Sequence, residues 1–367
     1  MILLTAALML QATEPTEYVV PDTACYVRRD FTHEVTDGED TIRIAGEFWL
    51  PEPSGPRPTV LMITGSGDHV RQQMISGTPM FGMIGDALAR AGFNVVLADP
   101  RGFGETTVNG ETFEGPHWLQ IPSSMRLRDN RQLVDWLAGQ PGVSDLVLLG
   151  HSEGAMIAAR LAGGDDPVSS VILLSDSAAP GIEVFARQRA DFMRREGVDD
   201  LTAERTRLAL IEFGRFVASE NRQDDTAYAP VAQAVIDAQA DLDEPFFTTD
   251  FLNFFRSESP WHREFMTYDP RGDLARIAVP VVAVYGGADD ATPPAIHMPV
   301  LADALAASSA SEAAIHLLPD QDHFFLEFEG ERVDRHPYGQ VRIAPELTSI
   351  LIGELSRRYG RHDYCED

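Results

Sequence analysis

The chain has 367 residues, of which 44% are hydrophobic and 23% are charged, a composition typical of soluble globular proteins. Asp and Glu number 57 against 29 basic residues, and the resulting net charge of −28 repels nucleic acid and anionic membrane surfaces, which excludes both as partners. All the basic residues are arginine, so mechanisms that need a lysine nucleophile or a phosphate-binding Gly-Lys-Ser/Thr loop are excluded as well.

The first expected element is the apolar run Ile2–Leu10. It is too short to span a bilayer, which takes ~20 residues, so we expect no stable membrane insertion. Its length suits a signal peptide with cleavage after Ala12, and a first strand or an unstructured end is the alternative. We expect export to the periplasm or the medium, and a cytoplasmic location otherwise. Cys25 and Cys365 fit either a disulfide that joins the chain ends or two inert thiols.

From residue 59 onward, short apolar runs alternate with helix-type segments. The expected strands are Thr59–Ile63, Asn94–Ala98, Leu146–Leu149 and Val171–Leu174, and the expected helices are Met80–Ala91, Arg128–Leu137 and Glu153–Leu161. Strands that alternate with helices at these lengths predict βαβ units. The fold class is therefore α/β, with a mostly parallel central sheet flanked by helices on both faces.

The pattern changes between Gly181 and Tyr268, where the periodicity is helical and no strand is indicated. The helices expected there are Arg187–Arg195, Leu201–Val217 and Tyr228–Ala240. Strands return at Val279–Tyr285 and Ala314–Leu318, with helices at Met298–Ala306 and Pro345–Arg358. We therefore expect a signal peptide over residues 1–12, an α/β core in two parts over 13–180 and 269–367, and a helical cap over 181–268.

Residues 150–154 read Gly-His-Ser-Glu-Gly and stand where an expected strand ends and an expected helix begins. A Gly-x-Ser-x-Gly pattern at such a junction is typical of the nucleophile elbow, a tight turn that strains the serine and exposes its hydroxyl. The two glycines let the helix and strand approach more closely than a Cβ would allow. We expect Ser152 to be a nucleophile, with the Glu153 N–H directed at the reacting carbonyl oxygen.

A serine nucleophile needs a histidine base, which is expected late in the chain, after the final strand. His323 lies in the loop that follows this strand, whereas His316 falls inside the strand and is expected to pack there. The acid is expected at the end of the preceding strand, where Asp289 and Asp290 are adjacent. Asp289 completes a Gly-x-x-Asp turn and is our choice, with Asp290 as the alternative.

A second oxyanion donor is expected in the loop after the first strand of the α/β pattern, where residues 64–69 read Thr-Gly-Ser-Gly-Asp-His. The backbone N–H of Ser66 is expected to act together with the Glu153 N–H, and loss of one such donor typically costs ~10²–10³ in rate. The Gly-x-Gly here lacks the third glycine of a dinucleotide-binding loop. No metal-ligand spacing occurs, and we expect neither a metal nor a cofactor.

Three motifs together resemble the α/β-hydrolase superfamily: Gly-Ser-Gly at 65–67, Asp-Pro-Arg-Gly-Phe-Gly at 99–104, and Gly-His-Ser-Glu-Gly at 150–154. They are similar to a bacterial branch of serine esterases and relatives of acylaminoacyl peptidases. The resemblance implies an α/β-hydrolase fold with Ser152, Asp289 and His323 as its catalytic triad. The chain departs from the branch at Asp68 and His69, where the branch usually has a proline, so the resemblance does not fix the substrate preference. A solvated loop is the alternative to a functional role for these two residues.

We therefore expect a cofactor-independent serine hydrolase that cleaves an ester of a small-molecule acyl substrate through an acyl-enzyme. The alternatives are a peptidase acting on short or N-capped peptides, and a catalytically inactive binding protein on the same fold. In the predicted cap, most aromatic rings are expected to pack in its core, while Phe254 and Trp261 are expected to line an acyl pocket. Activity is expected to rise with pH as His323 loses its proton.

Overall fold

The computed structural model describes residues 18–21, 24–113, 117–328, 332–333, 336–337 and 341–360. The expected signal peptide and Cys365 lie outside these residues. Cys25 is disulfide-bonded, so the alternative of a free thiol at this position is wrong. The chain divides into a sheet domain, within 13–116, 124–178 and 271–367, and a helical unit that comprises 117–123 and 179–270.

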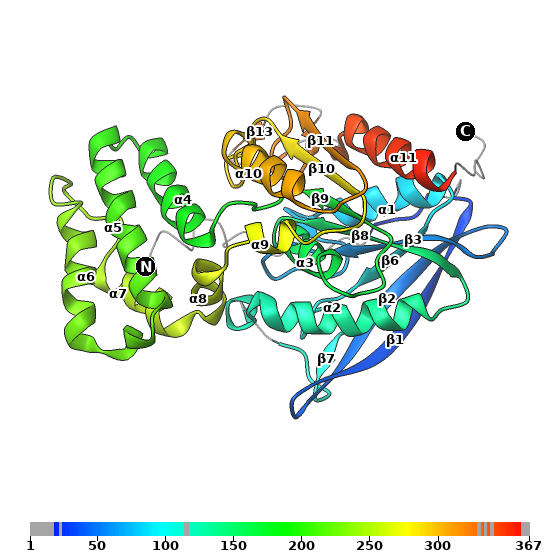
Figure 1. The fold of residues 1–367 in the computed structure, drawn as a ribbon, viewed down its shortest axis with the longest axis horizontal. Helices are drawn as coiled ribbons and strands as arrows, with labels where there is room; N and C mark the ends of the chain where they lie inside the picture. The colour runs from blue at the N-terminus through cyan, green and yellow to red at the C-terminus, as the bar shows by residue number, and fades with distance from the viewer. Residues whose placement is uncertain are drawn as a thin grey trace. The chain divides into compact units, whose positions relative to one another are not determined.

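The sheet domain contains one large sheet, in the order β1-β2-β6-β3-β8-β9-β10-β11 (Figure 1). Its strands are β1 (Tyr26–Asp37), β2 (Asp40–Pro51), β3 (Arg57–Ile63), β6 (Asn94–Ala98), β8 (Val143–His151), β9 (Ser170–Leu174), β10 (Val281–Gly286) and β11 (Ala313–Leu318), and β7 (Thr107–Val108) pairs with β2. The pairs β1–β2 and β2–β6 are antiparallel, and every pair from β6 to β11 is parallel. The expected α/β fold with a mostly parallel sheet is confirmed.

Helices cover both faces of this sheet. The helices are α1 (Met80–Arg90) and α11 (Pro345–Tyr359) on one face, and α2 (Ser123–Ala138), α3 (Glu153–Ala162), α9 (Arg271–Leu274) and α10 (Pro294–Ala307) on the other. Side chains alternate between the faces along each strand. In β3, Leu61 and Ile63 join the core beneath α2 and α3, and Val60 and Met62 join the core beneath α1 and α11. A strand buried on both faces reads as a continuous apolar run, which is why β3 was predictable.

The hairpin of β1 and β2 was not predicted. Its residues pair in unbroken register from Tyr26 with Pro51 to Asp37 with Asp40, across a turn at Gly38. Strand β1 lies at the edge of the sheet and is mostly half-buried or exposed, so it has no apolar run. The short strands were missed as well: β4 (Met74–Ile75), β5 (Thr78–Pro79), β12 (Leu326–Phe328), β13 (Arg332–Val333), β14 (His336–Pro337) and β15 (Val341–Ile343).

The helical unit contains no strand among its described residues. Its helices are the 3₁₀ helix η1 (His117–Gln120), α4 (Gly181–Arg195), α5 (Asp200–Ala218), the 3₁₀ helix η2 (Glu220–Gln223), α6 (Asp225–Asp237), α7 (Thr249–Asn253), the π-helix η3 (Phe254–Glu258) and α8 (Pro260–Thr267). The carboxylates of Asp199 and Asp224 cap the N-termini of α5 and α6 by accepting backbone N–H groups. In the described part of the chain, no helix is both long and apolar enough to cross a membrane.

The two ends of the 179–270 segment lie next to each other. The Gly181 N–H donates to the Tyr268 carbonyl over 2.9 Å. The approach is so close that a Cβ on Gly181 would lie 1.8 Å from the Phe265 carbonyl oxygen. A glycine is therefore needed where the helical segment begins.

Candidate active site

The nucleophile elbow joins β8 to α3 and has the geometry that its glycines predict. Ser152 has φ 55° and ψ −119°, a backbone conformation that is strained for a residue with a side chain. A Cβ on Gly150 would lie 2.1 Å from the Gly154 carbonyl oxygen, and one on Gly154 would lie 2.0 Å from the Ile63 carbonyl oxygen. Both glycines are thus required by the close packing of α3 on β3 and β8.

His323 and Asp289 form a hydrogen-bonded pair at the ends of β11 and β10. The Nδ1 of His323 lies 2.8 Å from Oδ2 of Asp289, and the Asp289 carboxylate also accepts bonds from the Ala291 N–H, the Thr292 N–H and the Thr292 hydroxyl. Asp289 is buried and Asp290 is exposed. Burial alone would raise the pKa of the Asp289 carboxyl, but the bond and the charge of His323, with the Thr292 bonds, lower it below its usual range. Asp289 is therefore the anionic partner of His323.

His151, the residue before Ser152, connects the elbow to the histidine loop. Its Nε2 lies 2.8 Å from the His323 carbonyl oxygen, and its Nδ1 lies 2.7 Å from Nε2 of Gln73. The Gln73 amide oxygen accepts the Gly65 N–H over 2.7 Å, so the Gln73 NH₂ faces His151 as a donor. His151 therefore carries its proton on Nε2 and donates a hydrogen bond to the His323 carbonyl oxygen. We call this chain of bonds from Gly65 through Gln73 and His151 to His323 the histidine relay.

The His151 side chain is neutral in this setting. Burial, and secondly the charge of His323, lower the pKa of His151 from 6.5 to about 3. Only 1% of the residue is exposed. Sequence reasoning assigned no role to His151 or Gln73, because a contact between residues 78 positions apart has no local signal.

The loop after β3 packs directly against Ser152. A Cβ on Gly65 would lie 3.4 Å from the Ser152 Cβ, so the Gly65–Ser66 peptide is adjacent to the elbow. In the same loop, burial and then the charge of Arg126 lower the pKa of His69 from 6.5 to about 4, against a hydrogen bond to the Ser66 backbone. His69 is thus neutral near pH 7. The aim of the Ser66 and Glu153 N–H groups at an oxyanion stays a prediction.

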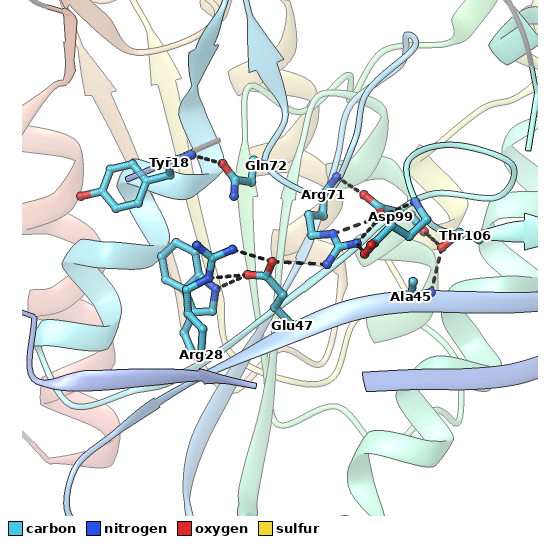
Figure 2. A network of polar contacts seen from close by, with 10 residues as sticks. Tyr18, Arg28, Ala45, Glu47, Arg71, Gln72, Asp99 and Thr106 are labelled. Atoms are coloured by element: carbon cyan, nitrogen blue, oxygen red, sulfur yellow. Dashed lines mark hydrogen bonds and ion pairs between the residues drawn. The ribbon is translucent and has the colours of Figure 1, made fainter. Parts of the chain in front are cut away.

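The far end of the loop is held by buried ion pairs, shown in Figure 2. Arg71 donates to Asp99 from its backbone N–H over 2.7 Å and from Nη2 over 2.6 Å. Its Nη1 lies 3.3 Å from Glu47, which also pairs with Arg28. Arg71 further contacts Glu105, which directly follows the Asp-Pro-Arg-Gly-Phe-Gly motif. Asp99 begins the Asp-Pro-Arg-Gly-Phe-Gly motif, so one function of this motif is to fix the loop.

A second carboxyl, Asp176, is buried just after β9. Burial raises the pKa of Asp176 to about 7, and the nearby Ser177 backbone N–H offsets this only in part. Within the described part of the chain, neither of its carboxyl oxygens has a hydrogen-bond partner, and the same holds for the Tyr285 hydroxyl. Sequence reasoning did not select Asp176, because a lone aspartate after a buried strand is also a common turn residue.

The two predicted pocket residues lie in the aromatic core of the helical unit. Trp261 is 8% exposed, stacks on Phe265 with ring centroids 5.1 Å apart, and meets Trp118 edge-on at 4.9 Å. Phe254 is half-buried and meets Phe255 edge-on at 5.3 Å. Their role in an acyl pocket stays a prediction. Across the described residues, no group of three or more His, Cys, Asp or Glu is placed to hold a metal ion.

Comparisons with known proteins extend this picture. Esterase EstD of Thermotoga maritima is 28% identical over 184 residues, which make up 50% of this chain but only 41% of EstD. The structure of the esterase Pf2001 of Pyrococcus furiosus has a TM-score of 0.53 at 11% identity and covers 94% of this chain and 96% of that one. The α/β hydrolase GrgF of Penicillium sp. sh18 has a TM-score of 0.51 at 15% identity and covers 91% and 99%. The family model for the alpha/beta hydrolase fold matches residues 58–329, which include the elbow, the loop after β3 and the Asp289–His323 pair, and the chain accordingly belongs to the alpha/beta hydrolase fold family.

Proposed function

We propose that the protein is a serine hydrolase that cleaves a carboxylic ester through an acyl-enzyme. The observation that carries the proposal is the relay geometry around the elbow. Ser152 is strained at the turn, while His151 beside it binds the backbone of His323, whose ring is in turn bonded to Asp289. Nucleophile, base and acid therefore come from three loops at the carboxyl ends of β8, β11 and β10, where open α/β sheets bind their ligands.

The proposed mechanism assigns a role to each of these residues. His323 accepts the Ser152 hydroxyl proton as Oγ bonds to the ester carbonyl carbon, and Asp289 stabilises the imidazolium that forms. The N–H groups of Ser66 and Glu153 bind the oxyanion of the tetrahedral intermediate. The imidazolium then protonates the leaving alkoxide. Water then bonds to the acyl carbon as it gives a proton to the same imidazole. The bond from this carbon to Oγ breaks as the imidazolium returns the proton to Oγ, which releases the acid and restores free Ser152.

The choice of an ester as substrate is supported by the two relatives that are named esterases, EstD and Pf2001. The motifs that resemble the acylaminoacyl-peptidase branch support a peptidase as the second candidate, although no group that would recognise a peptide terminus is apparent. We also propose export, on the length of the apolar run Ile2–Leu10.

A fluorophosphonate probe tests the proposal, because it labels an activated serine and leaves ordinary hydroxyls unmodified. We expect the wild-type protein to be labelled and Ser152→Ala to be unlabelled. Ser144→Ala serves as the matched control. Ser144 lies on β8, the strand that leads to the elbow, and its hydroxyl is at the surface, 3.0 Å from the Asp145 carboxylate. No labelling of the wild type, or labelling that survives in Ser152→Ala, would remove the serine hydrolase and leave the binding protein.

A substrate panel separates the two enzyme candidates. It sets p-nitrophenyl esters of graded chain length beside aminoacyl-nitroanilides. The proposal expects kcat/KM to be far higher for the esters. A preference for the nitroanilides would favour the peptidase.

A further inference from the structure

A buried arginine outside the triad contacts both segments that carry the proposed oxyanion donors. Arg126 lies in the first turn of α2 and is 8% exposed. Its Nη1 donates to the Gly65 carbonyl over 3.0 Å and to Oε2 of Glu153 over 2.9 Å. Its Nη2 donates to the Thr64 carbonyl over 2.7 Å and to the Thr64 hydroxyl over 2.9 Å. One guanidinium thus joins the loop after β3 to the first turn of α3.

The bond to Gly65 acts directly on the first donor. The Gly65 carbonyl and the Ser66 N–H belong to the same peptide, which is planar and trans, so the two groups point in opposite directions. A donor that fixes the direction of the Gly65 carbonyl therefore fixes the direction of the Ser66 N–H. A charged donor on the carbonyl also polarises the peptide and makes its N–H a stronger donor.

The bond to Glu153 acts on the second donor. The backbone N–H of Glu153 is the other proposed oxyanion donor, and its side chain is 3% exposed. A buried carboxylate so close to the reacting carbonyl would oppose the negative charge that develops there. The Arg126 guanidinium neutralises this carboxylate and holds the residue in place.

We propose that Arg126 is a positioning residue that sets the geometry of the oxyanion hole by orienting the Gly65–Ser66 peptide and pairing with the Glu153 side chain. The inference rests on the proposed function, since it concerns the same site. It requires arginine specifically, because only a planar guanidinium presents paired donors in the fixed directions of these four acceptors. A lysine at this position would keep the positive charge but would lack the paired N–H donors of the guanidinium.

The test compares Arg126→Lys with the wild type in kinetics and in the binding of a ¹³C-labelled trifluoromethyl ketone. Ser152 Oγ bonds to the ketone carbon, the carbonyl π electrons move onto the oxygen to give the hemiketal oxyanion, and the serine proton passes to His323. The ¹³C shift against pH gives the pKa of the hemiketal oxygen, which reports on the oxyanion hole alone. Arg57→Lys is the matched control, because Arg57 is 5% exposed and donates to the backbone carbonyls of Gly92 and Pro53 at the start of β3, the opposite end of the strand from the loop.

For Arg126→Lys we expect kcat to fall by about 10- to 100-fold, less than the ~10²–10³ for complete loss of a donor, with KM within about twofold. The hemiketal pKa should rise by about one to two units, since tenfold weaker stabilisation corresponds to about one unit. In Arg57→Lys both quantities should stay at the wild-type values. An Arg126→Lys protein with wild-type kcat and hemiketal pKa would overturn the inference, and so would equal changes in both variants.

Glu153→Gln keeps the inference testable if Arg126→Lys does not fold, because it removes the carboxylate charge and retains an acceptor for Arg126. We expect the hemiketal pKa to fall, because the negative charge beside the oxyanion is removed while the Arg126 charge stays in place. A folded Glu153→Gln protein with an unchanged hemiketal pKa would contradict the inference. Failure of the proposed function has a different signature, because the wild type itself would then form no hemiketal.

Discussion

The histidine relay makes a prediction about stability as a function of pH. His151 is neutral in the folded protein, with its pKa lowered from 6.5 to about 3 by burial and by the charge of His323. In the unfolded chain the pKa returns to about 6.5, so the unfolded chain takes up a proton first as the pH falls. The stabilisation is therefore complete above about pH 6.5 and is lost as the pH falls toward 3. We consider the substitution His151→Gln, which offers Gln73 an acceptor and His323 a donor without a titrating group.

The size of the effect follows from the two pKa values. Relative to pH 7.5, protonation of one unfolded imidazole lowers the free energy of unfolding by about 1.4 kcal/mol at pH 5.5 and by about 2.7 kcal/mol at pH 4.5. Other buried histidines, such as His69 with its pKa of about 4, act in the same direction in both proteins and cancel in the comparison. The wild type should therefore lose more stability than His151→Gln by these amounts.

Urea unfolding of both proteins at pH 7.5, 5.5 and 4.5, followed by the tryptophan fluorescence of the sheet domain, measures the difference. At pH 7.5 the variant should be the less stable protein, because glutamine does not match the imidazole geometry. The two stability curves should then converge as the pH falls. Parallel curves would show that His151 takes up a proton in the folded protein as readily as in the unfolded chain. The reasoning about the relay would then fail.

Four further predictions concern the elbow, the triad and the helical unit. Gly154→Ala should lower the melting temperature, because the new Cβ would lie 2.0 Å from the Ile63 carbonyl oxygen. The loss in the free energy of unfolding should exceed the ~1–3 kcal/mol of ordinary overpacking. Asp289→Asn should lower kcat by about 10⁴ with little change in KM, and a loss below tenfold would contradict its role. Trp261→Ala should lower the melting temperature, with a loss of about 3–5 kcal/mol in the free energy of unfolding. Phe254→Ala should lower kcat/KM more for long acyl esters than for acetyl esters, and equal losses on both esters would place the acyl pocket elsewhere.

Much of the parallel sheet could be predicted because its strands are buried on both faces and read as apolar runs. The elbow was predictable for a different reason, since its glycines mark a contact between backbones that excludes any Cβ. Asp289 was separable from Asp290 only by its place in a turn, and the structure gives the physical difference, since one is buried against His323 and the other is exposed.

The residues that sequence reasoning missed act through side chains that meet across long separations. Gln73 and Arg126 are a glutamine in a loop and an arginine on a polar helix, types that usually face solvent. Both are buried here because backbone groups of the loop after β3 need partners. The edge strand β1 escaped prediction because it is held by its register with β2, and not by an apolar pattern of its own.

The hydrogen bond between Gly181 and Tyr268 has a consequence for how this protein can change over evolution and in the laboratory. A segment whose two ends lie next to each other can be replaced by another segment, because the rest of the chain only has to bridge a short distance. Segments of other lengths and compositions should therefore be accepted between these two positions while Ser152, Asp289 and His323 are left in place.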